Sequence, residues 1–139
     1  MTSATVELSE TNGDVGSPTV HDGITNLNFG SADEYNLVVA DHPITKGLNS
    51  FKKYVRVHVS NIGTMNKVDN IQIWKSAGTY KTEETIQTNL RTSAYDGAHA
   101  YATPSAVTYT NQAMPTADPA SANLGIGGSL TGFLSAAGA

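Results

Sequence analysis

The amino-acid sequence predicts an all-β protein: a single β-sandwich of the immunoglobulin-like or jelly-roll type, with an extended N-terminal arm and a long loop rich in Ala, Thr and Pro. The first observation behind this prediction is a series of short runs in which apolar and polar side chains alternate. The second is that turn-forming residues separate these runs, among them 13 glycines and 5 prolines. The third is that only 14% of the residues are charged, which suits short strands better than long charged helices.

The chain has 139 residues, which is the size of one domain with one hydrophobic core. No repeat of fixed period divides it further. We therefore expect an N-terminal arm and loop over residues 1–21 and a β-sandwich domain over residues 22–139.

The N-terminal part of the chain contains two short alternating runs. Residues 4–8 (ATVEL) alternate briefly, which predicts either a first strand or an arm that pairs with a neighbouring subunit. Residues 9–23 are dense in turn-forming residues and predict a loop. In residues 24–31 (ITNLNFGS), Leu27 and Phe29 share one face, which predicts a half-buried strand.

The most strongly patterned stretch is residues 56–76, in which two alternating runs flank a turn-forming segment. They predict two central strands, and the residues expected to face the core are Val55, Val57, Val59, Ile71 and Ile73. Arg56 and His58 are expected on the outward face. Lys53 is expected at the entrance of the first strand, with its ammonium group reaching water.

Trp74, the only tryptophan, lies on the strand face opposite Ile71 and Ile73. Three roles are open for it: packing against a second apolar layer, a protein–protein contact, or a platform for sugar binding. Tyr54 becomes its cross-strand neighbour if the two central strands pair in register.

The C-terminal half of the chain is less regular. Residues 79–93 fit a helix, a pair of strands or an irregular excursion. Strands are expected near residues 98–103 and 107–109, followed by an extended, proline-containing loop through residue 123.

Composition and charge exclude several classes of function. The net charge is -4 and the 8 basic residues are scattered, which argues against nucleic acid as a partner, because phosphate binding needs clustered Lys and Arg. The absence of cysteine excludes disulfides and thiolate metal sites. There is no secretory signal and no apolar run long enough to span a membrane, so we expect synthesis in the cytoplasm without a signal peptide and no membrane partner.

The candidate metal ligands do not fall at the spacings that metal sites use. The histidines lie far apart in sequence, at His21, His42, His58 and His99. Residues 11–17 (TNGDVGS) and 31–36 (SADEYN) hold acceptor oxygens in loops, as calcium sites do, but turn formation by Asn and Asp explains both more simply. We therefore expect neither a metal nor a cofactor.

The sequence contains no recognisable catalytic pattern. There is no G-x-S-x-G motif around a serine, and the adjacent acidic residues Asp33 and Glu34 are typical of a solvated loop. Residues 125–128 (GIGG) lack the lysine that follows in a phosphate-binding loop. The chain is therefore expected not to be an enzyme.

Taken in order, four segments resemble small β-sandwich structural proteins of tailed bacteriophages: DGITNLNFGS (22–31), PITKGLNSFKKYVRVHVSNIG (43–63), KVDNIQIWKSAG (67–78) and SANLGIGGSLTGFLSAAG (121–138). The resemblance spans most of residues 22–138. It implies a non-enzymatic virion component, either a capsid decoration (cement) protein or a carbohydrate- or host-binding module of a tail or fibre. A decoration protein implies the phage major capsid protein and sister subunits as partners, and a homo-oligomer on the particle.

On this resemblance the residues up to about His21 are expected to lie as an arm on the coat or on a sister subunit. Relatives are expected to continue after residues 134–138 (LSAAG) into a further strand. Without that strand the sandwich has an open edge, which residues 3–8 (SATVEL) are expected to fill in the same subunit or a neighbour. The residues expected at the contact surface are Val6, Leu8, Tyr54 and Trp74.

Overall fold

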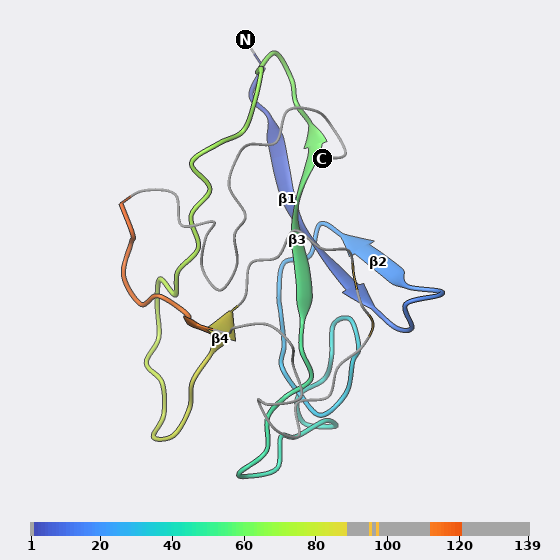
Figure 1. The fold of residues 1–139 in the computed structure, drawn as a ribbon, viewed down its shortest axis with the longest axis vertical. Coiled ribbons are helices and arrows are strands. Elements are labelled where there is room, and N and C mark those ends of the chain that lie inside the picture. The colour runs from blue at the N-terminus through green and yellow to red at the C-terminus, as the bar shows by residue number, and fades with distance from the viewer. Residues whose placement is uncertain (1, 89–94, 96, 98–111, 121–139) are drawn as a thin grey trace.

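A computed structural model describes residues 2–88, 95, 97 and 112–120, and the structural statements below concern these residues. They form the strands β1 (Thr5–Asn12), β2 (Thr19–Asp22), β3 (Tyr54–Asn61), β4 (Gln87–Thr88) and β5 (Gln112–Ala113). A three-stranded antiparallel sheet has the order β2-β1-β3, and β4 pairs with β5 in a second, small antiparallel sheet (Figure 1). No helix forms in this part of the chain, which confirms the all-β class for the described residues.

β1 is the central strand of the three-stranded sheet. Its first residue pairs with the end of β3 (Thr5 opposite Asn61), and its last residue pairs with the start of β2 (Asn12 opposite Thr19). The alternating N-terminal run is therefore a strand of its own subunit's sheet rather than an arm laid on a neighbour, because Thr5–Thr11 pair with β3 and the second half of β1, Ser9–Asn12, also pairs with β2. Deletion of residues 2–16, which would spare the sandwich if this segment were an arm, removes the centre of the sheet.

The register gives this sheet two chemically different faces, because residues two apart on a strand share a face and directly paired residues share it as well. The first face carries Val6, Leu8, Glu10, Asn12, Thr19, His21, Val55, Val57 and Val59. The second face carries Glu7, Ser9, Thr11, Val20, Asp22, Tyr54, Arg56 and His58. The first face is thus apolar where β1 begins and polar where β1 ends.

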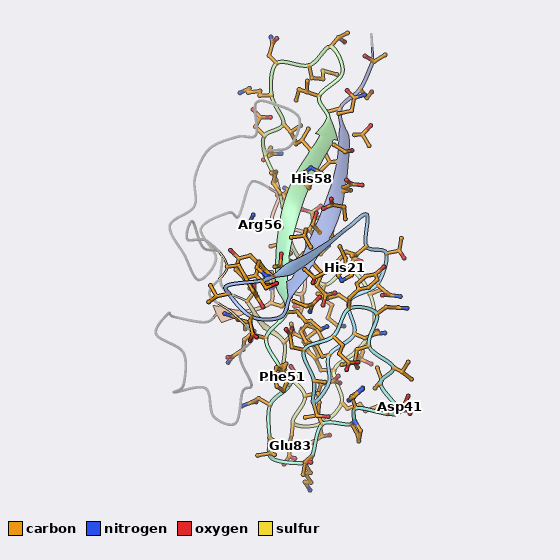
Figure 2. The ribbon with its side chains drawn as sticks, turned by 90° about the vertical axis from the view of Figure 1, so that its right-hand side faces the viewer. His21, Asp41, Phe51, Arg56, His58 and Glu83 are labelled. Atoms are coloured by element: carbon orange, nitrogen blue, oxygen red, sulfur yellow. The ribbon has the colours of Figure 1, made fainter. Side chains whose placement is uncertain are left out.

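The buried apolar residues are Ile24, Leu37 and Val59, at 8%, 2% and 0% exposure. Val55 and Val57 are half-buried, so the valine side of β3 does turn inward as the alternation predicts. Arg56 and His58 lie on the opposite side of the same strand (Figure 2).

The prediction of a second strand within residues 56–76 is wrong. Residues 69–80 form no strand, Ile71 is only half-buried and Ile73 is 36% exposed. Two features explain this. Asn70 adopts a left-handed backbone conformation with φ of 53°, which interrupts an extended run. The Lys75 N–H donates to the carbonyl of Pro115 at 2.8 Å, and this hydrogen bond is not part of a strand pairing.

Two further local predictions are wrong. Residues 19–22, expected in a loop, form β2 because β1 offers them a hydrogen-bonding edge. Residues 24–31, expected as a strand, form none; the Ser31 N–H donates to the His42 carbonyl at 3.1 Å and the Gly30 carbonyl accepts from Phe51 at 2.9 Å. The backbone groups of this segment are thus used by contacts with other loops and, at the Ile24 N–H, by a hydrogen bond of 3.0 Å to the Leu8 carbonyl of β1.

For residues 79–88, β4 is the element formed and a helix is absent. The strands expected near residues 98–103 and 107–109 lie outside the described residues. So do the last part of the loop through residue 123 and the glycine-containing segment that follows it.

A buried ion pair joins β1 to the chain just before β3. Lys53 Nζ lies 2.7 Å from Glu10 Oε1, and the two side chains are 2% and 1% exposed. Lys53 also donates to the backbone carbonyl of Glu34 at 2.5 Å. The expectation that the ammonium group reaches water is therefore wrong. The reason is that Lys53 lies beside the polar end of the first face, where the Glu10 carboxylate and the Glu34 carbonyl replace the water around its ammonium group.

We expect Lys53→Met to lower the free energy of unfolding by about 3–5 kcal/mol, because it leaves the Glu10 carboxylate buried without its cation. The measurement is urea denaturation followed by circular dichroism. The control is Lys46→Met in an exposed loop, which should change stability by less than about 0.5 kcal/mol. Equal, small effects of the two substitutions would show that the ion pair does not hold the sheet to the chain before β3.

Candidate functional site

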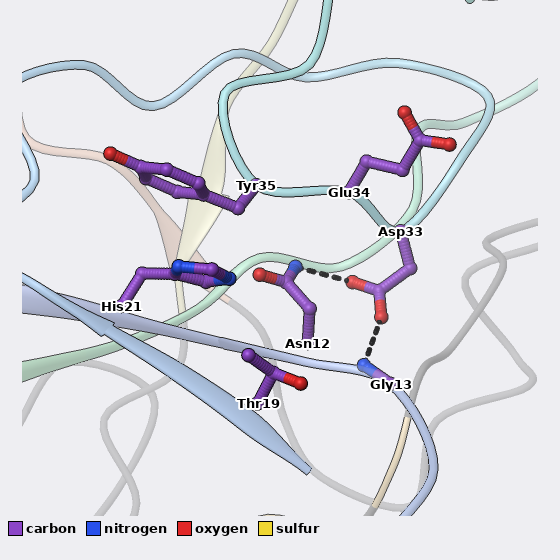
Figure 3. A pocket seen from close by; sticks show the side chains of 7 residues that line it. All are labelled: Asn12, Gly13, Thr19, His21, Asp33, Glu34 and Tyr35. Atoms are coloured by element: carbon purple, nitrogen blue, oxygen red, sulfur yellow. Dashed lines mark hydrogen bonds between the residues drawn. The ribbon is translucent and has the colours of Figure 1, made fainter.

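An open pocket of about 390 Å³ lies at the polar end of the first face, where β1 ends, β2 begins and the loop at residues 33–35 crosses them (Figure 3). The residues that line it are Asn12, Gly13, Thr19, His21, Asp33, Glu34 and Tyr35. A second pocket of the same size is formed almost wholly by the single loop at residues 75–80. We take the first as the candidate site because it gathers ionisable, amide and aromatic side chains from three separate parts of the chain.

Asp33 fixes the turn that follows β1. Its carboxylate accepts hydrogen bonds from the Gly13 N–H at 2.8 Å and from Asn12 Nδ2 at 2.9 Å. Gly13 has φ of 92°, a conformation that glycine adopts without the penalty of a side chain. The Tyr95 hydroxyl donates to the Gly13 carbonyl at 2.6 Å and holds the same turn from outside the sheet.

These contacts bring together the two loops whose acceptor oxygens first attract attention in the sequence, residues 11–17 and 31–36. The Asp33 carboxylate is occupied by N–H donors of the other loop, in contacts that span 20 and 21 positions of the chain and that the expected local turn does not include. Within the described residues, no three His, Asp or Glu side chains form a group that could hold a metal ion.

His21 and Tyr35 form a stacked aromatic pair on one wall of the pocket. Their ring centroids are 4.0 Å apart and their planes differ by 11°. His21 lies on β2 and Tyr35 lies in the loop at residues 33–35, and Tyr35 remains 42% exposed. The stack fixes the orientation of both rings at the pocket wall.

Asn12 holds a buried acceptor beside the pocket wall. Its Nδ2 donates to Glu10 Oε1 and to Asp33 Oδ1, both at 2.9 Å, so both amide hydrogens are engaged. Its Oδ1 is buried without a hydrogen-bond partner, and the whole residue is only 6% exposed. In Figure 3 this oxygen points toward the His21 ring. A buried acceptor without a donor is unfavourable, and such an atom in a native protein calls for an explanation.

The charges around the pocket are mostly negative. The Glu34 side chain is 56% exposed and lies 3.3 Å from His42 Nε2. The ammonium group of Lys53 is committed to Glu10 and to the Glu34 carbonyl. The Asp33 carboxylate is thus engaged by N–H donors, and the Glu34 carboxylate extends away from Asn12 and His21 (Figure 3).

A second polar cluster lies on the second face of the sheet. His58 Nδ1 is 2.9 Å from Glu7 Oε1 and 3.7 Å from Asp22 Oδ1. The Ser9 hydroxyl donates to Asp22 Oδ1 at 2.5 Å. Ser9 thus gives its hydrogen to a carboxylate rather than to the imidazole, which is not the arrangement of a serine activated by a histidine base.

The structure brings together two of the four contact residues that the sequence predicts. Val6 and Leu8 lie on the first face of β1 and are 44% and 46% exposed. Tyr54 lies on the second face, with its ring 5.1 Å from that of Tyr95 in an edge-on arrangement. Trp74 is half-buried in a segment that forms no strand, so it is not the cross-strand neighbour of Tyr54.

A comparison of the chain with known protein families, characterised proteins and solved structures finds no match. The described part of the chain holds no helix long and apolar enough to cross a membrane. The geometry of the site therefore has to be interpreted from its own chemistry.

We expect Asp33→Ala to lower the free energy of unfolding by about 1–3 kcal/mol, because the Gly13 N–H and one Asn12 amide hydrogen lose a charged acceptor. Urea denaturation measures the change. Asp41→Ala, in an exposed turn, is the matched control and should have an effect within about 0.5 kcal/mol. If both variants unfold at the wild-type midpoint, Asp33 does not hold the turn.

Proposed function

We propose that the chain is a non-enzymatic structural protein of a tailed-phage virion: a decoration protein that binds the outer surface of the capsid and stabilises it through protein–protein contacts. The proposal includes a complete β-sandwich, of which the described sheets form a part. The sequence resemblance of residues 22–138 supports it, and so does the surface of the three-stranded sheet.

The observation that carries the proposal is the apolar end of the first face. Val6 and Leu8 stand side by side on β1, opposite the fully buried Val59 and the half-buried Val57. Nearly half of each β1 side chain nevertheless remains exposed to solvent. Neighbouring apolar side chains left exposed on a rigid sheet are typical of a surface that another protein covers.

Decoration also suits a modest contact of this kind. A capsid repeats the same site many times by symmetry, and linked copies bind far more tightly than a single copy does. The partners are then the major capsid protein and sister subunits, the protein is located in the virion, and it forms a homo-oligomer on the particle.

The experiment that tests the function is sedimentation of the purified protein, alone and mixed with undecorated capsids of its own phage. A decoration protein co-sediments saturably, at a fixed ratio to the coat protein. Failure to co-sediment at any concentration would contradict the proposal.

We expect the double variant Val6→Ser, Leu8→Ser to bind capsids at least about fivefold more weakly, because the loss of both apolar side chains from the centre of an interface costs more than about 1 kcal/mol in total. Co-sedimentation titrations measure the change. The control is Val20→Ser, which removes a 54% exposed valine from the second face of the same sheet. Equal weakening by the control would show that the first face is not the contact surface.

The second candidate is a carbohydrate- or host-binding module of a tail or fibre. The observation that favours it is the open pocket with its stacked His21–Tyr35 wall and polar lining. It predicts binding to glycans or cell envelopes and none to empty capsids. Loss of that binding in Trp74→Ala would assign it to Trp74, whereas loss in Tyr35→Ala would assign it to the pocket.

A further inference from the structure

We propose that Lys53 and Asn12 join in an intramolecular isopeptide bond, and that Glu10 catalyses its formation. The side-chain amine of Lys53 attacks the side-chain amide carbon of Asn12, and ammonia leaves. The bond ties the end of β1 to the chain just before β3 within one subunit. This modification goes beyond the proposed function and does not depend on it.

The first observation is that one oxygen of Glu10 contacts both nitrogens that take part in the reaction. Glu10 Oε1 accepts a hydrogen bond from Lys53 Nζ at 2.7 Å and another from Asn12 Nδ2 at 2.9 Å. The lysine nitrogen has to lose protons in order to attack, and the amide nitrogen has to gain one in order to leave. A carboxylate in contact with both acts first as general base and then as general acid.

The second observation is that all three side chains are buried. The side chains of Lys53 and Glu10 are 2% and 1% exposed, and Asn12 is 6% exposed. Transfer of one proton from the ammonium group to the carboxylate removes both charges from a site that excludes water. The same transfer leaves the neutral amine that can attack. The fold holds this amine beside the amide, which replaces an encounter in solution by a reaction within one molecule.

The third observation concerns the amide of Asn12. Its two hydrogens are donated to Glu10 Oε1 and to Asp33 Oδ1, both at 2.9 Å, which fixes the plane of the group. Its Oδ1 has no hydrogen-bond partner, and it points toward the His21 ring in Figure 3. Negative charge develops on this oxygen when the amine adds to the carbon. An N–H of the imidazole on that side stabilises this charge.

The reaction balances without a co-reactant. Glu10 takes one proton from the Lys53 ammonium group, and the neutral amine adds to Cγ of Asn12 to give a tetrahedral intermediate. Glu10 then delivers its proton to Nδ2, and the bond from Cγ to this nitrogen breaks. The attacking nitrogen gives up a second proton through Glu10 as the carbonyl re-forms. One C–N bond forms, one breaks, and ammonia leaves with that proton as ammonium.

The bond gives the chain a covalent cross-link that its composition otherwise lacks. The sequence contains no cysteine, so no disulfide can form within it. An amide bond between Asn12 and Lys53 closes the intervening chain into a loop and restricts the unfolded state, as a disulfide does. The cross-linked chain is therefore more resistant to urea than a variant that cannot form the bond.

A competing reaction at the same carbon produces the same change in mass. The backbone nitrogen of Gly13 can attack Cγ of Asn12, which gives a succinimide and also releases ammonia. In the structure the Gly13 N–H is donated to Asp33 Oδ2 at 2.8 Å, so this nitrogen is held in another contact. The experiment must therefore locate the new bond as well as measure the mass of the chain.

The test is mass spectrometry of the purified full chain, both intact and after unfolding and protease digestion. We expect the intact chain to lack about 17 Da, the mass of ammonia, and a linked pair of peptides to contain Asn12 and Lys53. Lys53→Arg and Glu10→Gln should each leave the two peptides unlinked. The control Lys46→Arg changes an exposed loop lysine and should cross-link as the wild type does. Circular dichroism checks that each variant folds.

Four results overturn the proposal. A wild-type chain of full mass after prolonged incubation in the folded state shows that no bond forms. Loss of ammonia that persists in Lys53→Arg assigns the change to the succinimide. A bond from Lys53 to Glu10, with loss of about 18 Da as water, assigns the reaction to the carboxylate. Linkage of Lys53 to Asn12 in Glu10→Gln removes Glu10 from the mechanism. No capsid enters these measurements, so their outcome is separate from that of the proposed function.

Discussion

The ion pair between Glu10 and Lys53 is the constraint from which the arrangement of the site follows. Both side chains are almost fully buried, and a buried pair of charges is tolerated only where hydrogen bonds satisfy its remaining polar atoms. Asn12 donates to the same oxygen of Glu10 that Lys53 contacts. Lys53 reaches onward to the carbonyl of Glu34. The ion pair therefore fixes the amide of Asn12 and the loop at residues 33–35, which line the pocket together with β2.

Alternation in the sequence predicts β3 and the first half of β1, because Val6 and Leu8 on β1 and the valines of β3 fall at every second position. It misses the second half of β1, residues 9–12, which are expected in a loop and carry polar side chains. It does not predict β2, whose short polar run becomes a strand only because β1 presents an edge to it. It also fails at residues 69–80, where alternating isoleucines and Trp74 have no strand beside them. Strand formation depends on a partner, and a single sequence does not show which partner is available.

The pocket is predictable only in part, for a related reason. The loops at residues 11–17 and 31–36 stand out in the sequence because Asn, Asp and Gly in such runs form turns. Nothing in the sequence indicates that Asp33 closes the turn at Gly13, or that His21 stacks on Tyr35 from another loop. The position of Lys53 is missed because its partner Glu10 lies 43 residues away along the chain. All three contacts join residues far apart in the sequence. Their strength depends on how deeply the partners are buried, which a pattern of neighbouring residues does not show.

The apolar end and the pocket lie on one face of one strand, and this has a consequence for how a partner binds. Leu8 and Asn12 are four positions apart on β1, which is about 14 Å at the rise of an antiparallel strand. A protein–protein interface of ordinary size covers about 800 Å² on each partner and spans such a distance. A single partner surface can therefore cover Val6 and Leu8 and reach the pocket. In such a contact the apolar end supplies most of the affinity, while the polar side chains around the pocket restrict the orientation of the partner, because a mismatched orientation leaves polar groups without partners.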